Sequence, residues 1–210
     1  PVEQARSPDG TFSLVEAAYH GQEGVVEMLL KHNADPNQAR SPDGTFSLLD
    51  AAYKGHEGIV EMLLKHNADP NQARSTDGET ALYSAVWHNH TQVVGVLLKH
   101  NADPNQAKTS DGEPPLLCAT YHNRQKIVKL LLDHDANPFQ VKTDGTTALQ
   151  VASFKGHAEI LKVLLERDAD PHQAKPNGET PLHIAAYHGN EEVVKVLLDY
   201  GVDPNQAKDD

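Results

Sequence analysis

The chain has 210 residues and a formal net charge of -12, with 30 acidic side chains against 18 basic ones. Its single cysteine, Cys118, cannot form an intramolecular disulfide or a thiolate metal cluster, which favours a reducing, intracellular location in the cytoplasm or nucleus. No stretch approaches the roughly 18 consecutive apolar residues of a membrane span, so no membrane association is expected. The acidic balance also disfavours nonspecific binding to nucleic acid.

A turn dipeptide recurs every 33 or 34 residues, and each copy is followed by two apolar runs separated by Gly or Asn. The dipeptides are Asp9-Gly10, Asp43-Gly44, Asp77-Gly78, Asp111-Gly112, Asp144-Gly145 and Asn177-Gly178. Residues 7–40 and 41–74 are identical at 29 of 34 positions, which indicates a recent duplication. We therefore expect six repeats without linkers, after a tail of a preceding repeat (1–6): 7–40, 41–74, 75–108, 109–141, 142–174 and 175–210.

The last repeat illustrates how each unit is expected to fold. Thr180 can cap a first helix that begins at Pro181 and stops at Gly189. A second helix, from about Glu191 to Tyr200, carries an apolar stripe. Helices this short are marginal alone, so the units must stack, and the turn dipeptides predict hairpin-like fingers between them. The expected fold is an all-α solenoid of stacked helix-turn-helix units.

The last repeat resembles an ankyrin repeat. The residues that carry the resemblance are Gly178-Glu179-Thr180-Pro181-Leu182-His183-Ile184-Ala185-Ala186, then Gly189, Val193-Val194, Val196-Leu197-Leu198 and Gly201-Val202-Asp203. The similarity extends over essentially the whole chain. It implies that the residue after the Ala-Ala pair faces a concave groove whose composition is free to vary.

The first two repeats read Phe-Ser-Leu where the family has Thr-Pro-Leu, so the usual Thr cap is missing. Ser13 with Glu16, and Ser47 with Asp50, resemble a capping box. We therefore expect these two helices to begin one residue later, with Ser as the cap and the Phe just outside the helix.

An aromatic column follows the Ala-Ala pair or its equivalent in every repeat. It comprises Tyr19, Tyr53, Trp87, Tyr121, Phe154 and Tyr187. Aromatic side chains offer large contact areas at low entropic cost, so we interpret the column as partner-binding. The alternative is that each ring only covers its neighbour in the stack and was copied by duplication.

A column of cationic or titratable side chains comes next. It comprises His20, Lys54, His88, His122, Lys155 and His188. A cation at this position interacts favourably with the negative end of the first helix without any ligand. In the functional interpretation, rings and cations together form a groove for acidic or planar groups. Because four of the six are histidines, partner affinity would then change between about pH 5.5 and 7.5.

A basic row recurs at the bases of the fingers. It comprises Arg6, Arg40, Arg74, Lys108, Lys142, Lys175 and Lys208. Two interpretations stay open: solvated structural charges, which many ankyrin repeats carry here, or a contact surface for a partner with an acidic patch.

The 13 histidines do not predict a metal site. Equivalent residues of packed helices lie about 8 to 10 Å apart, whereas ligands of one zinc ion must lie within about 4 Å of each other. His88 and His90 form a close pair but lack a further ligand nearby. Cys118 stands among apolar residues, so we expect it to be buried. Because no catalytic triad, phosphate loop or carboxylate pair stands out, neither catalysis nor a cofactor is expected.

The leading hypothesis is a protein-interaction module that binds a peptide segment or a folded partner in the groove. The alternative is an anionic small molecule or short single-stranded nucleic acid stacked on the ring column, similar to ankyrin repeats that hold an oligoadenylate activator. Neither end carries an obvious polar capping repeat, so the natural protein is expected to continue or to pack end to end on another chain.

Overall fold

Pairs of short helices follow one another along the chain, and the structure, a computed structural model, describes residues 12–40 and 43–205. The chain divides into two units, residues 1–110 and 111–210, and each is described by itself. The first unit contains α1 (Ser13–Tyr19), α2 (Glu23–Lys31), α3 (Ser47–Lys54), α4 (Glu57–Lys65), α5 (Ala81–Trp87) and α6 (Thr91–Lys99). The second unit contains α7 (Pro115–Tyr121), α8 (Gln125–Asp133), α9 (Ala148–Lys155), α10 (Ala158–Leu165), α11 (Pro181–Tyr187) and α12 (Glu191–Asp199). The expected tail at 1–6, together with Arg6 and Lys208, lies outside the described residues.

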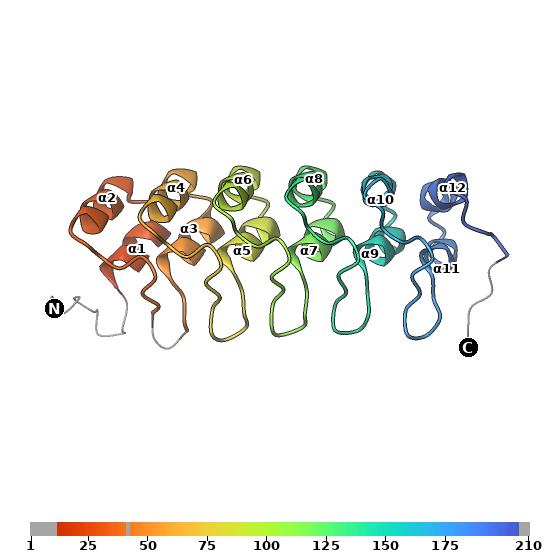
Figure 1. Cartoon of the computed structure of the whole chain (residues 1–210), viewed down its shortest axis with the longest axis horizontal. Helices are drawn as coiled ribbons and strands as arrows, with labels where there is room; N and C mark the ends of the chain where they lie inside the picture. Colours follow the sequence, from red (N-terminus) through yellow and green to blue (C-terminus); the bar gives the residue numbers. More distant parts are fainter. Residues whose placement is uncertain (1–11, 41–42, 206–210) are drawn as a thin grey trace. The chain divides into compact units, whose positions relative to one another are not determined.

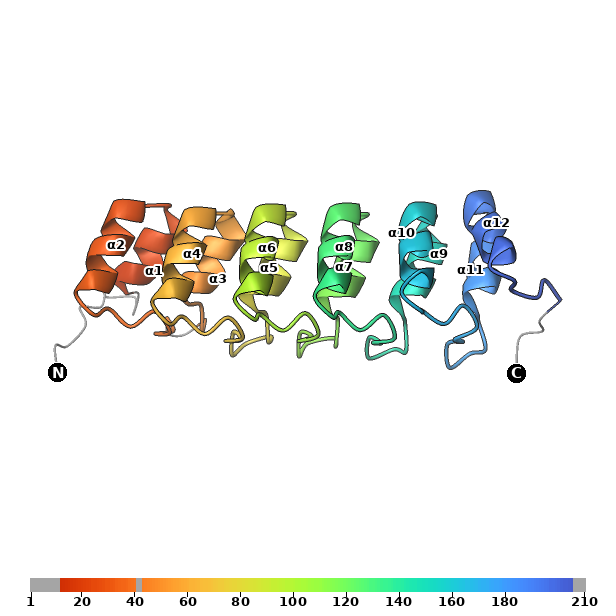
Figure 2. The ribbon, with the colours of Figure 1, turned by 45° about the horizontal axis from the view of Figure 1, so that its top comes forward.

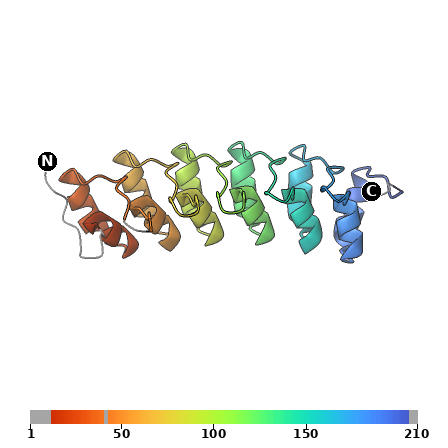
Figure 3. The same ribbon diagram turned by 90° about the horizontal axis from the view of Figure 1, so that it is seen from below.

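The helices of each unit form two layers (Figure 1). In the first unit α1, α3 and α5 pack side by side, and α2, α4 and α6 form the layer that covers them. The second unit repeats this arrangement with α7, α9 and α11 beneath α8, α10 and α12. Figure 2 shows the second helix of each pair in front of the first, and Figure 3 shows the helices of a unit side by side in one orientation. The predicted all-α repeat architecture is confirmed for the described residues.

The core lies between successive helix pairs. In α4, Ile59 and Leu63 are completely buried against the neighbouring repeats, and Val94 and Leu97 of α6 are also completely buried. Burying one such side chain contributes about 2 kcal/mol. Stacking, rather than helix propensity, therefore stabilises helices of only seven to nine residues. None of the helices in the described part of the chain has the length and hydropathy needed to cross a bilayer.

The residues predicted to begin and end the first helix of the last repeat do so in the structure. The Thr180 hydroxyl oxygen accepts a hydrogen bond from the His183 backbone N–H, and Pro181 is the first helical residue. Gly189 has a φ of +67°, in the left-handed region that follows the helix. In the first unit, Thr80 caps α5 in the same way, at 3.1 Å from the Tyr83 backbone N.

The Ser cap expected for the first two repeats is wrong, although each Phe lies just outside its helix as expected. Helices α1 and α3 begin at Ser13 and Ser47, and the residue at each N-cap is Phe12 or Phe46, with no side-chain cap hydrogen bond. Phe46 occupies the position that Thr80 occupies in α5, and its ring is completely buried. Packing between repeats thus decides at which residue the helix begins. Burial of the Phe ring stabilises the fold by more than the roughly 1 kcal/mol that a capping hydroxyl contributes.

Hairpin-like fingers connect the repeats, as predicted. Isolated antiparallel bridges close three of them, between Ala39 and Phe46, Ala73 and Thr80, and Val141 and Thr147. In the first finger the backbone N–H of Gly44 donates to the Arg40 carbonyl at 2.8 Å, and Gly44 has a φ of +73°. This positive φ is the conformation that the Asp-Gly turn signal anticipates.

Substitution at the α3 N-cap tests the competition between burial and capping. The change Phe46→Thr restores a cap but removes a buried ring, so we expect it to lower the free energy of unfolding by about 2 kcal/mol. The control Ser47→Ala should leave stability unchanged or raise it, because the Ser47 hydroxyl is buried without a partner among the described residues. Urea unfolding of both variants measures this, and a loss confined to Ser47→Ala would contradict the assignment.

Candidate partner-binding surface

Aromatic side chains at the ends of the first helices are partly exposed. In the first unit Tyr19, Tyr53 and Trp87 are 36%, 42% and 45% exposed. In the second unit Tyr121, Phe154 and Tyr187 are 47%, 47% and 86% exposed. In the first unit, the Ala pairs that precede Tyr19 and Tyr53 face the core, for example Ala51 and Ala52 at complete burial. The rings therefore supply apolar surface that is not buried by packing between the repeats.

A lysine from the next repeat lies over the ring of the preceding repeat. The Lys54 Nζ atom is 4.2 Å from the centroid of the Tyr19 ring and 5.3 Å from that of Tyr53. In the second unit the Lys155 Nζ atom is 3.9 Å from the Tyr121 centroid. Both distances allow cation-π attraction. We call Tyr19, Tyr53, Lys54, Trp87 and His88 the first ladder, and Tyr121, Phe154, Lys155, Tyr187 and His188 the second ladder.

Histidines of the same column pack edge-on against the rings. The centroid distances are 5.1 Å for His20 on Tyr19, 4.3 Å for His88 on Tyr53, 5.1 Å for His122 on Tyr121 and 4.6 Å for His188 on Phe154. His88 Nδ1 is also 2.9 Å from the Ser84 carbonyl oxygen in the last turn of α5, where a cation complements the helix dipole. Burial, followed by the charge of Arg124, lowers the pKa of His122. The two predicted columns are thus in contact with each other within each unit.

The two arginines of the basic row that the structure describes, Arg40 and Arg74, form ion pairs inside their own fingers. The Arg40 Nη2 atom is 2.5 Å from the Asp43 carboxylate, and this hydrogen bond lowers the pKa of Asp43 to about 2. Arg74 pairs with Asp77 at 2.6 Å and also with Glu79. Because both guanidinium groups close a finger, their positions favour the structural interpretation of the row.

The lysines of the basic row are also engaged with their surroundings. The Lys142 Nζ atom is 3.5 Å from the Asp111 carboxylate, and the Lys108 Nζ atom lies 4.8 Å from the centroid of the Tyr83 ring. The backbone N–H of Lys175 donates to the opposite side of its finger at 2.9 Å. The row therefore supports the fingers and the Tyr83 ring at these positions.

Two pockets open beside the first ladder. The pocket between Tyr19 and Tyr53 has a volume of about 340 Å³, and it is also lined by Arg40, Asp43, Thr45, Asp50, Arg74 and Thr76. The pocket between Tyr53 and Trp87 has a volume of about 280 Å³, and it is also lined by Arg74, Glu79, Tyr83, His88 and Lys108. Volumes near 300 Å³ lie at the small end of the ligand-binding range, so each pocket is suited to a side chain rather than a large ligand.

A buried carboxyl group lines the first of these pockets. Asp50 is only 8% exposed, and its Oδ2 atom is buried without a hydrogen-bond partner among the described residues. Burial raises the pKa of Asp50 to about 6, against the weaker opposing effect of the Arg40 charge. Sequence reasoning assigned Asp50 to a capping pair and missed this pocket, because an acid near a helix N-terminus is ordinarily a solvated one.

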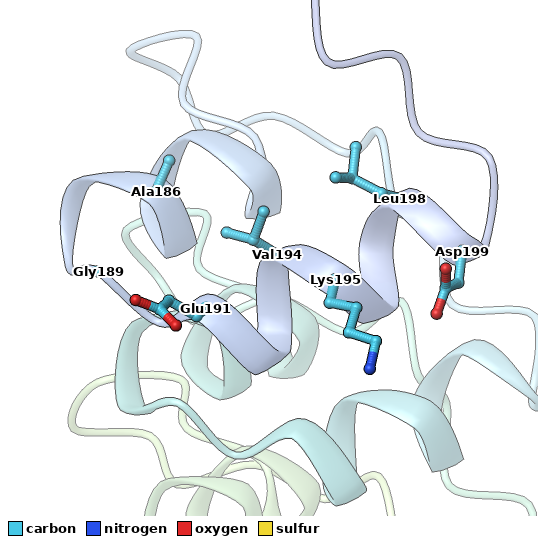
Figure 4. A pocket seen from close by; sticks show the side chains of 7 residues that line it. All are labelled: Ala186, Gly189, Glu191, Val194, Lys195, Leu198 and Asp199. Carbon is cyan, nitrogen blue, oxygen red and sulfur yellow. The ribbon is translucent and has the colours of Figure 1, made fainter.

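A further hollow, of about 390 Å³, lies on the last helix pair (Figure 4). Val194 and Leu198 project from α12 on the same side, and Leu198 is 41% exposed. Their counterparts in α10, Leu161 and Leu165, are buried where α12 packs on α10. The hollow is therefore the stacking face of the last repeat rather than a site of a different kind.

The titratable side chains do not assemble into a metal-ligand cluster anywhere in the described part of the chain. The rings of His88 and His90 stack with centroids 6.1 Å apart, and His90 Nε2 instead lies 3.0 Å from the Tyr53 carbonyl oxygen. Cys118 is buried, as predicted from its apolar neighbours.

The residue before several of the second helices has a role that the sequence analysis missed. In the first unit His56 and His90 contact the carbonyl oxygens of Tyr19 and Tyr53 in the preceding repeat, at 3.2 and 3.0 Å. In the second unit Asn190 donates to the Phe154 carbonyl at 3.1 Å. These bonds hold the backbone of the ring-bearing residues. The recurrence of polar side chains at this position was the available signal.

Comparison with known proteins identifies this repeat pattern. A family model described as ankyrin repeats (3 copies) matches residues 14–108, 48–142, 106–175 and 137–208. The matched segments together extend over nearly all of the described chain. The comparison with curated proteins gives no match.

Replacing the buried carboxyl tests its cost to the fold. We expect Asp50→Val to raise the free energy of unfolding by about 2 kcal/mol at pH 7. The folded-state pKa of about 6 lies above the ordinary 3.8, so the folded state binds the proton more tightly, and the penalty of ionisation develops as pH rises from about 4 to 6. The gain should therefore shrink toward pH 4.

Denaturant unfolding between pH 4 and 7 measures this gain. The matched control is Glu16→Val, at the equivalent position of the near-identical first repeat, where the acid is substantially exposed and lies 3.9 Å from Arg40. This control should show no comparable gain. A gain for Asp50→Val that is the same at pH 4 and pH 7 would contradict the electrostatic cause.

Proposed function

Because the chain belongs to the ankyrin repeat family, we propose that it is a non-catalytic module that holds a peptide segment or a folded partner protein against its two ladders. Ankyrin repeats are generally protein-protein interaction modules, and the family is generally non-catalytic. The finer assignment is that binding involves the ladders together with His20 and His122. We place this activity inside the cell, where proteins of this family are common.

The single observation that supports this proposal is the partial exposure of a ring at the end of every first helix. Half-exposed aromatic side chains bury a large area on binding while losing little conformational entropy. The backbone that carries several of these rings is held by hydrogen bonds from the next repeat, as at Tyr19 and Tyr53. Preorganised rings reduce the ordering cost of association, which favours recognition over a purely structural role.

Ring removal tests the proposal directly. Each of two triple variants removes the rings of one ladder: Tyr19→Ala/Tyr53→Ala/Trp87→Ala and Tyr121→Ala/Phe154→Ala/Tyr187→Ala. We expect the affinity for the protein captured by the unsubstituted chain to fall at least tenfold in one or both of these variants. The captured protein is purified, and its affinity is measured by calorimetry. Thermal unfolding establishes that each variant keeps its fold.

The matched control replaces two rings of equal exposure outside the ladders, Phe139→Ala and Tyr200→Ala, which are 45% and 47% exposed. This control should retain binding within about twofold. Retention of the captured protein by both triple variants would overturn the assignment of the ladders.

Salt titration separates a protein partner from an anionic ligand. The ladders carry Lys54 and Lys155, whereas Arg40 and Arg74 are already paired with carboxylates. We expect affinity for the captured protein to change by less than about fivefold between 50 and 300 mM salt, because the contact is largely apolar. A steep linear fall of log affinity with log salt would instead favour a phosphate-bearing ligand such as a short single-stranded nucleic acid.

A further inference from the structure

The four repeats that follow carry no acid at the position of Asp50. The equivalent residues, four places after each helix N-cap, are Ser84, Cys118, Val151 and Ile184. All four are small or apolar, and Ser84 and Cys118 are almost completely buried. An acid at this position opposes the stability of the stack, because burying an uncompensated carboxylate is costly. The fold therefore gives no reason for Asp50.

The pocket leaves the Asp50 carboxyl without a direct counter-charge. Its two lining cations are both committed elsewhere, Arg40 to Asp43 at 2.5 Å and Arg74 to Asp77 at 2.6 Å. Oδ2 of Asp50 has no hydrogen-bond partner among the described residues. The pocket therefore offers a buried acceptor for a donor that comes from outside the described chain.

The rings beside the pocket are suited to a positive group. Tyr19 and Tyr53, from adjacent repeats, both line the pocket. The Lys54 ammonium already lies 4.2 Å from the centroid of the Tyr19 ring. The other charges near Asp50 are mixed, because Arg40 and Arg74 lower its pKa whereas Asp43 and Glu16 raise it. A cation in the pocket would therefore gain from the ring faces and from the Asp50 carboxylate itself.

We propose that the pocket between Tyr19 and Tyr53 is a subsite for a basic side chain, Arg or Lys, of the bound protein partner, with Asp50 as its counter-charge. This inference rests on the proposed function and adds the chemical class of one partner residue. A volume of about 340 Å³ accommodates a single long side chain. An Arg guanidinium satisfies the subsite best, because it donates several hydrogen bonds from a plane that can stack on tyrosine.

Small probes test the subsite without knowledge of the partner. The probes are N-acetyl-arginine amide and N-acetyl-citrulline amide, which have nearly the same shape but differ by the positive charge. Binding is followed through the backbone amide NMR signals of Asp50, Tyr53 and Thr76. We expect the arginine probe to bind the unsubstituted chain at least fivefold more tightly than the citrulline probe. N-acetyl-lysine amide should bind with an affinity between the two.

Two matched variants assign the preference to one carboxyl. In Asp50→Asn, the advantage of the arginine probe should fall below twofold. In Glu16→Gln, which removes the same charge at the equivalent position of the first repeat, the advantage should remain within twofold of its original value. Asp50→Val should behave as Asp50→Asn does, and its expected stability gain keeps the comparison valid if the Asn variant unfolds.

Equal binding of the two probes, or absence of shifts at the pocket amides, would overturn the subsite. So would an arginine preference that survives in Asp50→Asn. These outcomes are distinct from failure of the proposed function. Loss of the captured partner on ring substitution with no arginine preference overturns the subsite alone, whereas an arginine preference with full partner retention by the ring variants overturns the ladder assignment alone.

Discussion

A pair of two-turn helices cannot bury its own apolar side, and every other feature of this protein depends on that constraint. The side chains of α4 that face both neighbours, Ile59 and Leu63, are completely buried. Leu198, at the equivalent place to the buried Leu165 but without a following helix pair in the described chain, is 41% exposed. The same residue type is thus core or surface according to whether a neighbour is present, so stability belongs to the contact between repeats.

Stacking also decides local questions that are usually decided by the sequence near a helix end. Phe46 stands where Thr80 provides a cap, yet α3 starts at the same height as α5. Moving Ser47 into the place that Thr80 occupies in its repeat would shift the whole helix by one residue. This shift would rotate the helix by about 100° and turn Leu48 and Leu49 away from their neighbours. One cap is worth about 1 kcal/mol, whereas each of these buried leucines contributes about 2 kcal/mol, so packing sets the register.

Periodicity was enough to predict the helices and the fingers, because these follow from where a residue stands within its repeat. The exposure of the ring column was implied by the family resemblance, with structural stacking as the alternative. Periodicity could not predict which partner each charged side chain contacts. Lys54 lies over a ring of the preceding repeat, whereas Arg40 turns back to Asp43 within its own finger. Such choices depend on the spacing and tilt of residues about 34 positions apart, which a repeating sequence leaves undetermined. The helix-end motif at Asp50 was misleading for the same reason, since burial there comes from the neighbouring repeats.

Near-duplicate repeats make a departure at one position informative. Glu16 and Asp50 occupy equivalent places in repeats that are otherwise almost identical, but Glu16 contacts Arg40 and His20 at the surface, whereas the shorter Asp50 is enclosed. Asp50 is shorter by one methylene and its helix has a neighbouring repeat on each side, whereas the helix of Glu16 has a neighbouring repeat on only one side among the described residues. The fold gains nothing from enclosing Asp50, because a buried carboxylate without a partner is destabilising. A chain built from interchangeable units can carry such a cost in one unit, since the other stacking contacts remain, and this is how recognition can be specific on a scaffold that is otherwise uniform.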